Sequence, residues 1–200
     1  AMGIEEEKLK DTINSHPGAK GIFVNNPTYY GAASNLREIV RLTKQNNILA
    51  LVDEAHGSHL PFHHSLPPSA MSLGADMSAI SLHKTGGSMT QSSALLTNNV
   101  NVNGIGIKTI INLMQTTSAS YILMASLDLA RKQLALKGEY MVQNAIGLAR
   151  YAREHINEIE GLYAFGPELV GKPGIFAFDE TKLGVNMYGL GLSGYETESI

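Results

Sequence analysis

Reactive side chains follow three short apolar runs in the first half of the chain. Residues 21–25 precede a polar segment, residues 48–52 lead into the sequence DEAHG that begins at Asp53, and residues 77–82 lead into a His-Lys pair that ends at Lys84. Short apolar runs bounded in this way are typical of buried β-strands. Ligands of open α/β sheets bind beyond the carboxyl ends of the strands. We therefore expect an acid, an imidazole and an amine to meet at one edge of a sheet.

The acid and the amine suit the chemistry of pyridoxal phosphate (PLP). A lysine amine can hold the aldehyde of PLP as a Schiff base, and a carboxylate can pair with the pyridinium nitrogen so that the ring draws electrons. Lys84 and Asp53 are residues of these two types. Each also has an ordinary interpretation, because a lone lysine at a strand end is usually a solvated surface residue and a lone aspartate often caps a helix or turn. The combination, rather than either residue alone, indicates PLP.

The remaining pattern predicts the elements that position these groups. Strands are expected at residues 21–25, 48–52, 77–82, 93–97, 174–178 and 184–188, and helices at 4–14, from Asn35 onwards, and at 105–114, 118–136 and 139–159. Asn35 with Glu38 three residues later is a variant of the capping box. Short apolar strands that alternate with helices indicate an α/β fold, with three α/β/α layers around a mostly parallel sheet.

The composition of the chain and the positions of its glycines and prolines indicate its segments and exclude several classes of function. We expect an N-terminal helix and linker at 1–16, a PLP-binding segment at 17–160, and the start of a second, truncated unit at 161–200. The formal charge of −3 gives no reason to expect a nucleic-acid or membrane partner. The chain has no cysteine and its acidic N-terminal segment is unlike a signal peptide, so a cytoplasmic location is expected.

Two other interpretations of the DEAHGSH region fail. His59 and His63 have the spacing of zinc ligands on one helical face, but Pro61 between them breaks a helix and no carboxylate stands at the expected place, so no metal is expected. The letters DEAH also occur in nucleic-acid helicases. That function requires a phosphate-binding G-x-x-x-x-G-K-[ST] loop, which the sequence lacks.

An ordered series of motifs resembles the ornithine/lysine/arginine decarboxylases, which are PLP enzymes with the aspartate aminotransferase fold (fold type I). The segments are PTYYG at 27–31, DEAHGSHLPFH at 53–63, LPPSAMSLGADMSAISLHKTGGSMTQSS at 66–93 and QTTSASYILMASLDLAR at 115–131. The resemblance implies that Lys84 forms the Schiff base and that Asp53 holds the pyridinium proton. It implies that His56 lies near the ring or its phenolic oxygen. It further implies that Ser81 and His83 reach the cofactor phosphate.

The resemblance also implies a reaction and its partners. The expected reaction is decarboxylation of a basic amino acid (arginine, lysine or ornithine) to the amine used in polyamine metabolism, with Lys84 and His56 as catalytic residues. Thr28 and Tyr30 are expected at the same rim, and Thr90 with Gln91 belongs to the family pattern and could face a partner subunit. Enzymes of this fold build their sites between subunits, so a homodimer or higher homo-oligomer is expected.

The sequence departs from the family pattern at both ends. The Gly/Ser/Thr-rich phosphate loop and the ring-stacking residue that normally stand upstream do not precede Gly21, and the C-terminal domain is expected to be cut off near Gly194. We therefore expect the isolated segment to be inactive and its parent to be a decarboxylase. Two alternatives stay open: a truncated non-catalytic scaffold that binds no PLP, and a PLP aminotransferase or lyase of the same fold.

Overall fold

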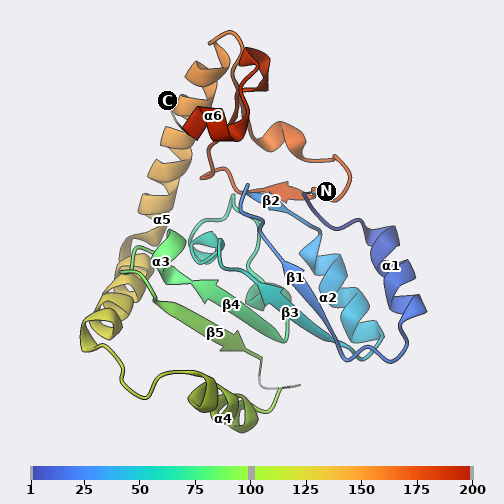
Figure 1. The fold of residues 1–200 in the computed structure, drawn as a ribbon. Helices are drawn as coiled ribbons and strands as arrows, with labels where there is room; N and C mark the ends of the chain where they lie inside the picture. Colours follow the sequence, from blue (N-terminus) through green and yellow to red (C-terminus); the bar gives the residue numbers. More distant parts are fainter. Residues whose placement is uncertain (1, 99–101, 199–200) are drawn as a thin grey trace.

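The central sheet has four strands in the order β1-β3-β4-β5 (Figure 1). The computed structural model describes residues 2–98 and 102–198. The strands are β1 (Gly21–Asn25), β3 (Leu49–Asp53), β4 (Met77–Ser81) and β5 (Ser93–Thr97). The first three run parallel and β5 pairs antiparallel with β4. The predicted α/β class with a mostly parallel sheet is confirmed.

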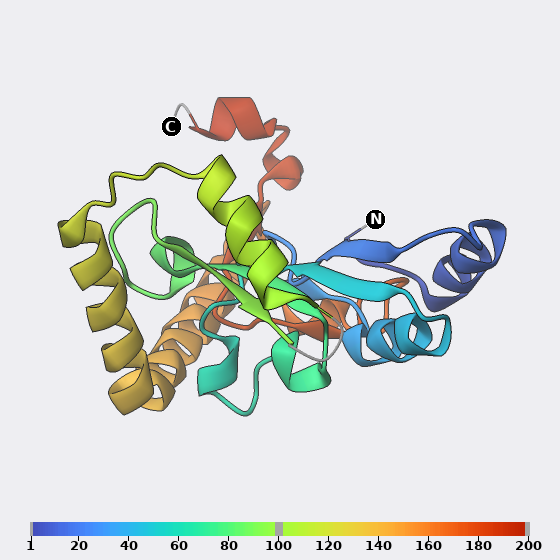
Figure 2. The same ribbon diagram turned by 90° about the horizontal axis from the view of Figure 1, so that it is seen from below.

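Two helices cover one face of this sheet. They are α1 (Glu6–Ser15) and α2 (Leu36–Gln45), which lie together on one side of the sheet in Figure 2. The side chain of Asn35 accepts a hydrogen bond from the backbone N–H of Glu38, so the predicted N-cap of α2 is confirmed. The apolar side chains of both helices form one buried core with the facing strand residues, among them Leu9, Ile13, Ile39, Val40, Val24, Ala50 and Val52.

The register of the strands assigns the site residues to the opposite face. Side chains alternate along a strand, and Asp53 pairs with Ala79, two residues before Ser81. Asp53 and Ser81 therefore project from the same face as Phe23, whose partner across the sheet is Leu51. Phe23 is 71% exposed. The face that carries Asp53 and Ser81 is thus open at β1.

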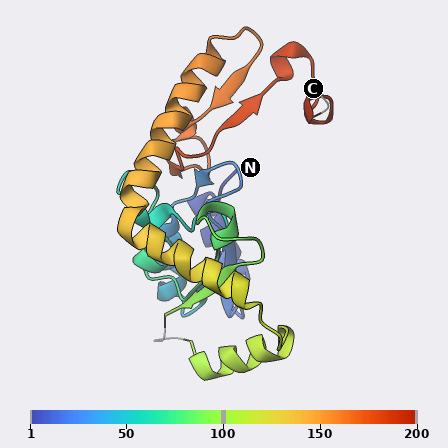
Figure 3. The same cartoon turned by 90° about the vertical axis from the view of Figure 1, so that its left-hand side faces the viewer.

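The second half of the chain is dominated by one long helix. The prediction of two helices at 118–136 and 139–159 is wrong, because α5 (Tyr121–Asn157) continues through Gly138. A Cβ atom built at Gly138 would lie 2.8 Å from Phe62, so this glycine permits close packing rather than a break. Figure 3 shows α5 running along the molecule from α4 (Gly104–Met114) towards the last strands.

The C-terminal residues form two small antiparallel sheets. In one, β2 (Ala32–Ala33) pairs with β7 (Ala177–Phe178), and in the other β6 (Tyr163–Phe165) pairs with β8 (Gly184–Asn186). The remaining elements are the short helices α3 (Leu82–Thr85) and α6 (Gly194–Glu198) and 3-10 turns at 60–62, 71–73, 167–169 and 188–190. The β2–β7 pair ties the C-terminal residues to the segment that follows β1. The turn after β7 lies against the loop that follows β3, where the hydroxyl of Thr181 is 3.1 Å from His59.

Candidate active site

Asp53 ends β3 on the open face of the sheet. One carboxylate oxygen, Oδ1, accepts the backbone N–H of Ala55 at 3.0 Å. The other oxygen makes no hydrogen bond with any residue in the described ranges. The turn thus orients the carboxylate and leaves one oxygen available to a ligand.

His56 follows Asp53 by three residues and contacts Lys84. Its Nε2 is 3.5 Å from Nζ of Lys84. Burial lowers the pKa of His56, the positive charges of Lys84 and Lys182 lower it further, and Asp53 opposes them. The charges of the carboxylate and of the amine therefore both act on this imidazole. The structure brings the three groups to one rim.

Lys84 stands on the one-turn helix α3 that directly follows β4. Its side chain is exposed. The hydroxyls of Ser58 and Thr85 are 2.7 Å apart, which ties the loop after β3 to the residue that follows Lys84. This contact fixes the two chain segments that carry the amine and the imidazole.

His83 and Ser81 flank the lysine. Nδ1 of His83 is 2.9 Å from the carbonyl oxygen of Ser92. A carbonyl only accepts, so Nδ1 carries a hydrogen and a neutral ring presents a lone pair at Nε2. His83 can therefore donate a hydrogen bond from Nε2 only as an imidazolium.

The PTYYG segment reaches the same rim through Tyr29. The rings of Tyr29 and His56 meet edge to face with centroids 5.3 Å apart. Tyr30 packs against Tyr29 and Phe165, and Thr28 donates its hydroxyl to the carbonyl of Ala32. The ring beside the imidazole is thus that of Tyr29. Thr90 and Gln91 are exposed.

A buried polar layer lies beneath the rim. Glu54 is 1% exposed and accepts hydrogen bonds from the backbone N–H of Ala70 and the hydroxyl of Ser78. Burial raises the pKa of Glu54. Nearby, Nε2 of His59 is 3.0 Å from Oδ2 of Asp179, and both side chains are buried. Glu54 and His59 are therefore buried residues with structural partners, and they lie next to the site.

Sequence reasoning missed the contribution of the turn after β7. Thr181 donates its hydroxyl to Asp179 at 2.7 Å and lies 3.1 Å from His59. Lys182 comes next and faces His56 and Lys84 closely enough to lower the pKa of His56. No local signal marks these residues, since they reach the rim only through the pairing of β7 with β2.

The histidine-rich stretch has partners of its own. His63 contacts Ser65 and Gln143 and stacks on His64. In the described part of the chain, no group of three His, Asp or Glu side chains could hold a metal ion. None of the helices described there is long and apolar enough to cross a membrane.

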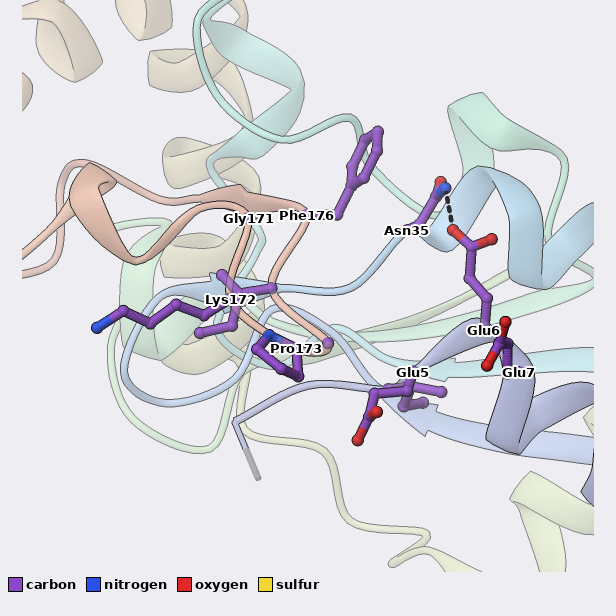
Figure 4. Close-up of a pocket in the computed structure, with 11 residues that line it drawn as sticks. Glu5, Glu6, Glu7, Asn35, Gly171, Lys172, Pro173 and Phe176 are labelled. Atoms are coloured by element: carbon purple, nitrogen blue, oxygen red, sulfur yellow. Dashed lines mark hydrogen bonds between the residues drawn. The ribbon is translucent and has the colours of Figure 1, made fainter.

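A separate cavity of about 330 Å³ lies between the N-terminal residues and the 171–176 loop (Figure 4). Its wall includes three consecutive acids, Glu5, Glu6 and Glu7. The amide of Asn35 donates to Glu6 at 2.7 Å. None of the predicted site residues lines this cavity. It belongs to the packing of α1 rather than to the rim.

The sequence of the chain matches a known protein family and several curated proteins. The family "Orn/Lys/Arg decarboxylase, major domain" matches residues 1–187. The chain is 48% identical over 196 residues to an arginine decarboxylase of Halalkalibacterium halodurans and 45% identical to one of Bacillus subtilis. These alignments cover 98% of this chain and 40% of each relative, so the chain spans about 40% of their length.

Solved structures show the same fold at low sequence identity. The cysteine desulfurase CsdA of Escherichia coli superposes with a TM-score of 0.66 at 15% identity, over 92% of this chain and 47% of its own. Mouse CSAD superposes with a TM-score of 0.61 at 18% identity, over 86% of this chain and 39% of its own. With a matching family over most of its length, the chain belongs to the Orn/Lys/Arg decarboxylase family and has the fold of PLP-dependent enzymes of fold type I.

Proposed function

We propose that this chain carries the lysine-bearing part of the PLP site of an arginine decarboxylase. The observation that carries the proposal is the convergence of Asp53, His56 and Lys84 at the ends of neighbouring strands, with His56 and Lys84 in contact at 3.5 Å. Arginine is proposed as the substrate, ahead of lysine and ornithine, because the curated relatives are named arginine decarboxylases.

The donor set fits PLP. The cofactor presents an aldehyde, a ring nitrogen and a phosphate, and the rim offers an exposed amine at Lys84, a carboxylate oxygen without a partner among the described residues at Asp53, and a hydroxyl at Ser81. Asp53 and Ser81 project from the same open face. An aromatic ring therefore has a surface to lie on, and groups suited to its functional atoms stand around that surface.

Each residue has a distinct task in this proposal. When bound, PLP supplies an electron sink for the bond that breaks. Lys84 would hold the aldehyde of the cofactor through its amine, and Asp53 would hold the ring nitrogen through its carboxylate. His56, kept neutral by burial and the lysines beside it, accepts or returns a proton at the rim. His83 and Ser81 would hold the phosphate of the cofactor, Ser81 by donating its hydroxyl.

The reaction would release carbon dioxide and the corresponding amine, an entry to polyamine metabolism in the cytoplasm. Because the chain spans about 40% of its relatives, we propose the activity for a protein that contains this segment and expect the isolated 200 residues to be inactive.

A homo-oligomer is also proposed. Large apolar side chains on α4 and the start of α5 are exposed, including Ile105, Leu113, Met114, Tyr121 and Ile122, each at least 70%. Exposed apolar patches of this kind mark interaction surfaces in soluble proteins. Sedimentation velocity tests this proposal, and a strictly monomeric protein would contradict it.

Covalent trapping tests the role of Lys84. The chain is mixed with PLP, reduced with borohydride and digested, and the modified lysine is identified by mass spectrometry. Modification is expected at Lys84 in preference to Lys172, an exposed lysine distant in sequence from the site. Lys84→Ala should abolish this adduct and Lys172→Ala should leave it unchanged. An adduct spread evenly over surface lysines would favour the scaffold without PLP.

Product analysis separates decarboxylation from the other reactions of the fold. The purified protein containing this segment is incubated with PLP and arginine, lysine or ornithine. Release of carbon dioxide with the amine is expected from arginine. Formation of a keto acid would instead indicate an aminotransferase.

A further inference from the structure

Lys182 is a partly buried cation without a counter-ion. Among residues 2–98 and 102–198, its Nζ makes no hydrogen bond or ion pair. Of the two acids just before it in the chain, Asp179 lies 3.0 Å from His59 and accepts the hydroxyl and the backbone N–H of Thr181, and Glu180 pairs with Arg150 at 2.7 Å. An ammonium that is removed from water and lacks an acidic contact is costly. The site therefore has room for a negative charge.

The protein holds this lysine firmly in place. Its carbonyl accepts a 2.7 Å hydrogen bond from Arg153, and its N–H donates to the carbonyl of Asp179. The aliphatic stem packs over Gly31 of the PTYYG segment, where an added Cβ would lie 2.9 Å from Cγ of Lys182. Gly31 also has a φ of +90°. A side chain at position 31 would push the lysine away from the rim.

A cavity of about 300 Å³ lies beside the lysine. It is bounded by Lys182, Thr181 and His59 on one side and by the residues directly after Lys84, together with apolar side chains of α5, on another. His59 is 5% exposed, and its Nδ1 has no hydrogen-bond partner in the described part of the chain. Two polar groups without partners, one cationic and one imidazole, thus border a cavity next to the Lys84 turn.

The charges around this cavity are unbalanced. Burial lowers the pKa of Lys182, Asp179 raises it, and Lys84 lowers it. On the same rim, the positive charges of Lys84 and Lys182 both disfavour protonation of His56, and Asp53 is the acid that opposes them. Asp53 is assigned to the ring nitrogen in the function proposed above. The rim therefore presents two ammonium groups, Lys84 and Lys182, to a ligand.

We propose that Lys182 forms an anion-binding subsite next to Lys84, which receives a carboxylate or phosphate group of the bound ligand. The proposal rests on the proposed function, since both the amino acid and the cofactor carry such a group. A lysine ammonium binds either group as a point charge, and the shared chemistry is an oxyanion held between Lys182 and the Lys84 turn.

Matched ligand pairs identify which oxyanion is bound. Dissociation constants are measured by calorimetry for arginine and for agmatine, its decarboxylated amine, and for pyridoxal phosphate and pyridoxal. The unmodified chain should prefer the anionic member of one pair, and Lys182→Met should reduce that preference about tenfold, the size expected for a charged hydrogen bond. Lys182→Arg should retain it, and Lys172→Met serves as the surface control. Loss in the arginine pair assigns the carboxylate, and loss in the pyridoxal pair assigns the phosphate.

A second measurement requires no variant. The titration of the Lys182 ammonium is followed by NMR in the unmodified chain, and its midpoint should rise when the anionic ligand is added and stay unchanged with the neutral analogue. The absence of any preference for an anionic ligand, or an unchanged preference in Lys182→Met, overturns the subsite. The PLP adduct at Lys84 distinguishes the failure of this subsite from the failure of the proposed function. If only the subsite is wrong, the adduct still forms.

Discussion

Adjacent residues of the DEAHGSH segment have opposite environments. Asp53 lies at the open rim with one carboxylate oxygen free of any described partner, whereas Glu54, the next residue, is 1% exposed and satisfied by Ala70 and Ser78. His56 contacts Lys84 at the rim, and His59, three residues later, is buried against Asp179. Residue type alone therefore does not tell a candidate site residue from a structural one. What separates them is whether the side chain lies at the open rim or in the buried interior beneath it.

Replacement of the two acids should show the largest difference between these environments. Glu54→Ala would leave the N–H of Ala70 and the hydroxyl of Ser78 buried without a partner, so we expect a loss of about 3 kcal/mol in the free energy of unfolding. Asp53→Ala should cost less than about 1 kcal/mol while removing the proposed contact with the ring nitrogen. Urea unfolding measures both. Equal losses in the two variants would contradict the distinction between rim and interior.

The buried ion pair is the next test. Asp179→Ala would leave His59 without its acidic partner and should destabilise the fold by about 2–3 kcal/mol. The neighbouring acid Glu180 pairs with Arg150 at 2.7 Å on the surface, and Glu180→Ala is the matched control, with an expected loss of about 0.5 kcal/mol. If both substitutions lower the free energy of unfolding in urea by the same amount, the contact between Asp179 and His59 contributes no more to stability than a surface ion pair.

The two buried carboxylates should also differ in pH dependence. Burial raises the pKa of Glu54 above its ordinary 4.5, so its contribution to stability falls as the pH rises from that value through the folded-state pKa. Burial would also raise the pKa of Asp179, but His59 and Thr181 outweigh it and lower the pKa below 3.8. The contribution of Asp179 is therefore present above pH 3.8 and is lost on acidification below it.

Isosteric variants isolate these two contributions. The difference in unfolding free energy between the unmodified chain and Glu54→Gln should shrink with rising pH. The difference for Asp179→Asn should shrink with falling pH. Each slope is on the order of 1 kcal/mol per pH unit at most. Unfolding curves between pH 3 and 8 give both slopes, and slopes of the same sign would show that one of the two environments is misassigned.

Local signals predicted the sheet and the three groups at its edge. Strands β1 and β5 begin and end where the apolar runs do, and Asn35 caps α2 as its spacing with Glu38 indicates. These features depend on residues close together in the chain. Lys182 could not be found in this way, because it comes to the rim through the pairing of β7 with β2 and the contact of its stem with Gly31.

Gly138 failed as a local signal for a related reason. A glycine inside a helical pattern usually weakens the helix, and the two helices predicted at 118–136 and 139–159 leave Gly138 between them. The structure shows instead that α5 continues and that Gly138 lets the helix approach Phe62. Gly138 and Phe62 are 76 positions apart in sequence (138 − 62). Neither the hydrophobic periodicity nor the helix propensity of α5 can therefore predict their contact.

Two glycines of α5 extend the same comparison, with the smallest expected effects. Alanine in place of an exposed helical glycine stabilises a protein by about 0.5–1 kcal/mol. Gly147→Ala should show this gain, because an added Cβ there has no atom within 4 Å. Gly138→Ala should instead lose about 1 kcal/mol, since its Cβ would lie 2.8 Å from Phe62 and force the ring to move. Thermal unfolding of the two variants under one set of conditions measures the difference. Equal gains would mean that the ring of Phe62 moves without a cost in stability. The close approach of α5 at Gly138 would then not fix the position of the loop that carries Phe62 and His59 beneath the rim.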